Sequence, residues 1–133
     1  MRKTVSASLF LVAVIWIAST AAQTPSGGGD IKMNPVAATS GQGVSNAALL
    51  DRPEVRVLRV DLAPGAVRNI HTHDDTQFHL WIPVTGNPQI EIKPDKPLDV
   101  GPWKAQFIKG GMRHGFKNFG TTTATVIEVF VKK

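Results

Sequence analysis

From Val55 to the end of the chain, apolar and polar residues alternate in short segments with a period close to two, as in β-strands with one buried face. Each segment is bounded by Gly, Pro, Asn or Asp, the residues that favour turns. One boundary is the Pro64-Gly65 pair, which predicts a turn at the end of the first strand. The expected strands cover residues 55–62, 67–73, 77–84, 89–93, 105–108, 114–118 and 123–131.

No segment has the length and period of a strong amphipathic helix, so the pattern predicts an all-β fold. Short strands joined by frequent turns are typical of a sandwich or a barrel. The chain has 133 residues, too few for two separate cores, and we expect one domain over residues 51–133. Because such a domain has a small core, we also expect pairing into a homodimer, through an exposed strand or the N-terminal arm.

The N-terminus has the layout of a secretory signal peptide, which we place at residues 1–22. Arg2 and Lys3 give a basic start, an apolar run covers residues 9–18, and small residues follow. We expect cleavage after Ala22, with the preceding alanine as the alternative. The run is shorter than the roughly 20 residues that span a bilayer, so we expect no stable membrane anchor. The pattern therefore predicts a periplasmic or secreted protein.

Residues 23–50 lie between the predicted signal peptide and the predicted domain. As far as Val44 they are rich in Gly, Ser, Thr, Pro and Ala without sustained periodicity, which predicts a flexible leader, part of which could dock as an arm. A short apolar patch at residues 47–50 predicts a single turn before Pro53 starts extended chain.

Composition and charge exclude several kinds of site. Removal of residues 1–22 takes away two of the 15 basic residues and none of the 10 acidic ones, which leaves a net charge of +3. The remaining basic residues are scattered, without the dense runs and aromatic platforms of nucleic-acid-binding proteins. The chain has no cysteine and no tyrosine, so a metal ion must be bound through nitrogen or oxygen. The candidates for proton transfer near neutral pH are therefore His, Asp, Glu and Lys.

The four histidines of the chain are candidate metal ligands. His71 and His73 lie two positions apart in a predicted strand, so both imidazoles can point to one spot. His79 shares strand parity with Gln77, and a returning strand can bring either side chain, or both, to the same face. His114 stands at the start of a later strand, near the others if a barrel closes. Imidazole nitrogens suit manganese, iron, nickel, copper or zinc, and the sequence does not choose among these divalent ions.

The histidine spacings resemble the first motif of the cupin superfamily, G-x5-H-x-H-x3,4-E-x6-G. Gly65, His71, His73 and Gly86 match this pattern. His79 stands at the position of the glutamate ligand, after a longer turn than the family has. The resemblance therefore leaves two candidates, His79 or Gln77, for the fourth ligand.

The second cupin motif, G-x5-P-x-G-x2-H-x3-N, is matched in its second half by Gly111, His114 and Asn118. Trp103 stands where its first glycine is expected and Lys109 where its proline is expected, so we expect a different hairpin there. The resemblance extends over residues 52–131. It implies a small single-domain antiparallel β-barrel, or jelly roll, with one metal ion.

The ligand set bears on the chemistry. Neutral imidazoles leave the ion its full positive charge, which favours an anionic substrate or a ligand derived from dioxygen. We expect no carboxylate in the site that could act as a base. The family includes dioxygenases with three or four histidine ligands, which implies an oxygen-using enzyme acting on a small organic molecule. A non-catalytic metal- or small-ligand-binding module is the alternative, and sugar isomerisation or epimerisation is a weaker option.

Further side chains flank the predicted ligands. Arg68 and Arg113 could clamp a carboxylate, although surface charge is the simpler interpretation. Four apolar side chains are expected to line the mouth of the barrel or to fill its core: Trp81, Phe107, Met112 and Phe116.

Overall fold

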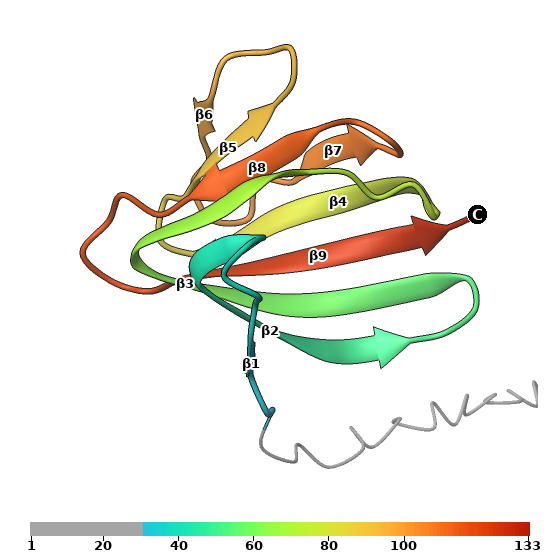
Figure 1. Ribbon diagram of the computed structural model, residues 1–133, viewed down its shortest axis with the longest axis horizontal. Helices are drawn as coiled ribbons and strands as arrows, with labels where there is room; N and C mark the ends of the chain where they lie inside the picture. The colour runs from blue at the N-terminus through green and yellow to red at the C-terminus, as the bar shows by residue number, and fades with distance from the viewer. Residues whose placement is uncertain (1–30) are drawn as a thin grey trace, which may run out of the picture.

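The computed structural model describes residues 31–133 and is all-β (Figure 1). This part of the chain contains no helix with the length and hydropathy needed to cross a membrane. The predicted signal peptide and residues 23–30 of the predicted leader lie outside the described residues. The strands are β1 (Asn34–Pro35), β2 (Gly41–Asp51), β3 (Val55–His71), β4 (Thr76–Thr85), β5 (Gln89–Ile92), β6 (Leu98–Asp99), β7 (Gln106–Lys109), β8 (His114–Lys117) and β9 (Ala124–Lys132).

All strand pairs are antiparallel, and the main path of the sheet runs β6-β5-β8-β3-β9-β4-β7. β2 pairs with β3, and β1 pairs with β2. The first half of β3 pairs with β9 and its second half with β8, so this one strand joins two walls. Figure 1 shows the sheet curling over itself, with β5 and β8 above β9 and β2 in that view. This arrangement is the predicted jelly roll.

The turn predicted at Pro64-Gly65 is a bend within β3, because the strand continues through it to His71. Gly65 has a φ of 74°, in the left-handed region that glycine adopts without steric cost. The two strands expected on either side of this pair are therefore one bent strand. β4, β5, β7, β8 and β9 lie within one residue of their predicted ends.

Residues 41–50, predicted as leader and single turn, instead belong to β2, an eleven-residue strand. β2 pairs with β3 from Gly41, opposite Arg68, to Asp51, opposite Arg56. Its small residues let Val44 and its neighbours lie close to β3, and Val44 is 4% exposed in the core. Backbone pairing and this burial stabilise a segment whose composition favours a loop.

Asn118, the last residue of the second motif, anchors the bend in β3. Its Nδ2 donates to the carbonyl oxygens of Leu62 at 2.9 Å and Thr122 at 2.8 Å, and its Oδ1 accepts from Gly120 N at 2.9 Å. Its backbone carbonyl accepts from Gly65 N at 2.9 Å. The side chain is buried and all its polar atoms are paired.

The Asn118→Ala variant is expected to unfold more easily by about 2–4 kcal/mol, because one buried and two part-buried carbonyl groups lose a hydrogen-bond donor. Urea denaturation followed by circular dichroism measures this loss. The exposed Asn87→Ala is the matched control and should change stability by less than about 0.5 kcal/mol. Equal stability of the two variants would contradict a structural role for Asn118.

Candidate metal centre

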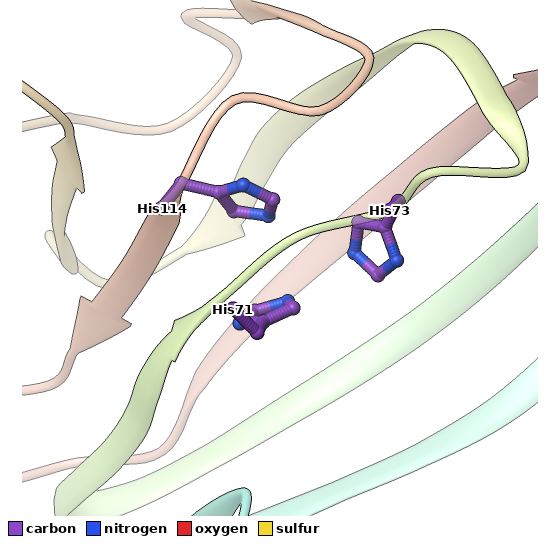
Figure 2. A group of neighbouring side chains, drawn as sticks. All are labelled: His71, His73 and His114. Carbon is purple, nitrogen blue, oxygen red and sulfur yellow. The ribbon is translucent and has the colours of Figure 1, made fainter.

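Three histidines surround one space between β3 and β8 (Figure 2). His71 ends β3 and lies opposite His114, the first residue of β8, in the strand register. His73 follows two residues after His71, in the turn to β4. One ring nitrogen from each of the three lies within 4.8 Å of the others. A single metal ion could be held among them, as the sequence predicts.

His79 lies on β4 beside this group, 1% exposed. Its ring centroid is 4.7 Å from that of His114 and 5.3 Å from that of His73. Gln77, the other candidate, has an exposed side chain. The pairing of β4 with β9 is irregular between Thr76 and Phe78, and this irregularity breaks the parity that His79 and Gln77 would share in a regular strand. Of the two alternatives, His79 lies against the other rings.

Backbone carbonyl groups fix the tautomers of two imidazoles. His71 Nδ1 lies 2.8 Å from Asn69 O, and His114 Nδ1 lies 2.9 Å from Met112 O. A carbonyl oxygen only accepts, so Nδ1 carries the proton and Nε2 presents a lone pair.

The Nε2 atoms of His73, His79 and His114 are buried, with no hydrogen-bond partner among residues 31–133. Unpaired buried nitrogens are energetically costly, and a bound metal ion would satisfy them. The donor set therefore fits a divalent transition metal ion.

Burial keeps these imidazoles neutral. It lowers the pKa of His73 to about 4, with repulsion from His71 and His114 adding to the shift. Burial and the neighbouring imidazoles lower the pKa of His79 to about 3, and burial lowers that of His114 to about 4. The pKa of His71 is also lowered, mainly by burial. At neutral pH the rings are thus available as ligands without loss of a proton.

Two arginines lie near the imidazoles, one of them predicted. Arg68 is half-buried on β3, and its Nη1 donates to Ser40 O at 3.4 Å. Arg113, the other predicted clamp, is exposed. Arg56 was not predicted, and its guanidinium carbon lies 4.9 Å from the centre of the Phe130 ring. The interior is therefore more positive than the sequence suggested.

Sequence reasoning did not single out Glu128 on β9, which is 5% exposed and faces the barrel interior. Burial raises its pKa to about 7, against the attraction of Arg68 and Arg56. The sequence does carry a signal for this placement. Glu128 has the same strand parity as Val126 and Phe130, so it interrupts an apolar face.

The aromatic side chains divide between core and surface. Trp81 and Phe116 are buried, with ring centroids 5.6 Å apart, and Met112 packs against the core. Phe107 is 61% exposed, on the face of β7 opposite the buried Ile108. Its ring centroid lies 5.2 Å from that of Phe78. Its predicted place at the mouth or in the core was wrong, because β7 turns this residue outward.

Glu128 should make stability fall as pH rises. Its folded-state pKa is about 7 and its ordinary value is 4.5, so the folded state binds more protons than the unfolded state between these values. Unfolding free energy therefore decreases through this window, by about 3 kcal/mol in total. Glu128→Gln removes this contribution, and urea denaturation between pH 4 and pH 8 measures it. Exposed Glu54→Gln is the control, and the same pH slope in both variants would refute the assignment.

No protein-family model matches the sequence, and no curated protein matches it. Solved structures do resemble this fold. A predicted oxalate decarboxylase from Thermotoga maritima superposes with a TM-score of 0.71 at 22% identity, over 78% of this chain and 95% of its own. The polyketide cyclase RemF from Streptomyces resistomycificus gives 0.69 at 20% identity, over 78% and 75%. An RmlC-like cupin from Shewanella frigidimarina gives 0.65 at 14% identity, over 78% and 86%. At these identities the likeness is one of fold.

Proposed function

Because the chain has the cupin fold, we propose that it is an exported metalloprotein that binds one divalent transition metal ion through His71, His73 and His114, with His79 as a fourth ligand. The observation that carries this proposal is the group formed by one ring nitrogen each of His71, His73 and His114, which lie within 4.8 Å of one another. The buried Nε2 atoms of His73, His79 and His114, which have no hydrogen-bond partner among the described residues, support it. The predicted signal peptide supports a periplasmic or secreted location.

We further propose that the protein is an oxygen-using enzyme that acts on a small organic anion. When bound, the metal ion supplies Lewis-acid and redox chemistry at the histidine group. Arg56 and Arg68 supply positive charge that attracts and orients an anion, and the surrounding apolar side chains exclude water.

The second candidate is a metal- or ligand-binding module without catalysis. The proximity of His79 to His114 favours it, since a fourth imidazole on the ion would leave fewer open positions for substrate. One experiment separates the two. Metal content is measured on the purified protein, and oxygen uptake is followed with phenols, diketones and organic acids. Turnover of any of these compounds supports the enzyme. Bound metal without turnover, together with a spectrum that shows no open coordination position on the metal, supports the non-catalytic module.

Two rows of mostly apolar side chains lie on the outer face of the wall formed by β3, β9, β4 and β7, and we propose that a second copy of the chain packs against them. One row across the four strands is Val57, Val129, Leu80 and Phe107. The next row contains Val55, Val131 and Phe78 and ends at the exposed Lys109 on β7. These side chains alternate with inward-facing residues of the core, and a cluster of apolar side chains on an outer face is unusual for a free surface.

Phe107→Lys is expected to convert this dimer to a monomer, because it places a charge at the most exposed apolar side chain of the two rows. Sedimentation velocity at several concentrations measures the change. Phe119→Lys is the matched control, since Phe119 is 70% exposed in the loop after β8. A parent protein that is monomeric at every concentration would refute the dimer.

A further inference from the structure

Apart from the imidazoles, three buried polar side-chain atoms have no hydrogen-bond partner in the part of the chain that the structure describes. They are Arg56 Nε, Trp81 Nε1 and Glu128 Oε1. Two of the atoms are donors and one belongs to a carboxyl group. Native proteins rarely leave such groups unpaired. The metal ion proposed above does not account for the two N–H groups, because a cation does not accept from an N–H group.

The three residues share one wall of the barrel interior. Trp81 lies directly opposite Glu128 in the pairing of β4 with β9, and both side chains are buried. Arg56 lies opposite Phe130, two residues beyond Glu128, so Arg56 and Glu128 are diagonal neighbours on adjacent strands.

Phe130 connects this wall to the histidines. The Arg56 guanidinium lies 4.9 Å from the centre of its ring. The rings of His73 and His79 each lie 4.8 Å from it. Groups on this wall therefore face the same interior as the candidate metal ligands.

Arg56 and Glu128 attract each other, yet no ion pair or hydrogen bond joins them. Arg56 stacks on Phe130 instead. A ligand that bonds to both residues would need an anionic acceptor for the guanidinium and a hydroxyl group for the carboxyl group. A dianion such as phosphate would be repelled by ionised Glu128, whereas a single carboxylate beside a hydroxyl group satisfies both.

We propose that Arg56, Trp81 and Glu128 bind a small hydroxycarboxylate, with the two N–H groups donating to its carboxylate and Glu128 hydrogen-bonding to its hydroxyl group. The inference rests on the proposed function, because it names the substrate class of the same metal centre. The half-buried Arg68 adds positive charge from the far half of β3.

The test uses zinc-loaded full chain and three probes of similar size: glycolate, acetate and ethylene glycol. Calorimetry gives their affinities, and the indole N–H signal of Trp81 in nitrogen-15 spectra reports on the site. Trp103, 74% exposed, is the internal reference for that signal. Glycolate should bind about 10-fold more tightly than acetate and shift only the Trp81 signal, and ethylene glycol should not bind.

Substitutions assign the partners. Arg56→Met should weaken both acids by about 10- to 100-fold, and Arg56→Lys should restore part of this loss. Glu128→Leu should remove most of the preference for glycolate over acetate, since an apolar side chain neither donates to nor accepts from the hydroxyl group. Arg113→Met is the matched control, and this exposed arginine should leave all affinities unchanged.

Metal content, measured on every variant, separates the two proposals. If the parent protein binds no zinc, the proposed function fails. The hydroxycarboxylate site is then tested by itself, by titration of the metal-free chain with glycolate. If zinc is retained and glycolate binds no better than acetate, the inference is overturned. It is equally overturned if Arg56→Met and Arg113→Met bind glycolate with the same affinity.

Discussion

The double variant His71→Ala, His114→Ala is expected to lose its metal ion. These two residues are register partners, and both have Nδ1 bonded to a backbone carbonyl, so their Nε2 lone pairs are already aimed at the site. Loss of an outer hydrogen-bond partner alone costs 10- to 100-fold in metal affinity. Loss of two ligands should therefore cost at least about 1,000-fold. Mass spectrometry after dialysis and a competition titration with zinc measure this change.

Thr72→Ala is the matched control, because Thr72 is exposed between His71 and His73 and this variant should keep full metal occupancy.

The parent protein should also hold its metal ion well below neutral pH. Protons compete with the metal for the imidazoles, so affinity falls as pH falls through their pKa values. Burial lowers these values to about 4 for His73 and His114, which moves the decline below the ordinary value of 6.5. Metal retained by the double variant would refute the site.

Gly110→Ala is expected to be the most destabilising single change, by about 4 kcal/mol or more. A Cβ atom there would lie 1.9 Å from Thr76 O and 2.9 Å from Gln77 O. Both neighbours are backbone atoms of β4, and Gly110 N already donates to Gln77 O at 2.8 Å. The strands must separate, which displaces the segment of β4 that carries His79.

Urea denaturation and circular dichroism measure the effect of Gly110→Ala. Gly101→Ala is the control, since its Cβ would meet only the side chain of Asn87 at 3.5 Å, an ordinary contact. It should change stability by less than about 1 kcal/mol. Comparable stability of the two variants would show that β4 and β7 are not packed as closely as the structure indicates.

Most of the fold could be predicted from the sequence because alternation with a period of two survives wherever one strand face is buried. β9 is the clearest case, with buried and less buried residues alternating from Ala124 to Phe130. β2 could not be predicted, because small and polar residues give it no periodicity and pairing with β3 stabilises it. β6, only two residues long, leaves no pattern at all.

The histidines of the candidate site could be predicted from the sequence, but the charged side chains around them were predicted only in part. His71 and His73 share a face by simple strand parity, and a motif located His114. The choice between His79 and Gln77 depended on an irregular strand pairing, which no residue pattern shows. Glu128 was overlooked although parity with Phe130 placed it inside, because an acidic residue in an apolar strand is usually attributed to the surface.

The carbonyl groups of Asn69 and Met112 that orient two of the imidazoles belong to the main chain. Any residue at these positions offers the same oxygen atom, so the ring orientations do not depend on the identity of those side chains. Mutational drift can therefore replace both residues while the tautomers of His71 and His114 stay fixed. An architecture of this kind retains a metal-binding geometry while most of its sequence diverges.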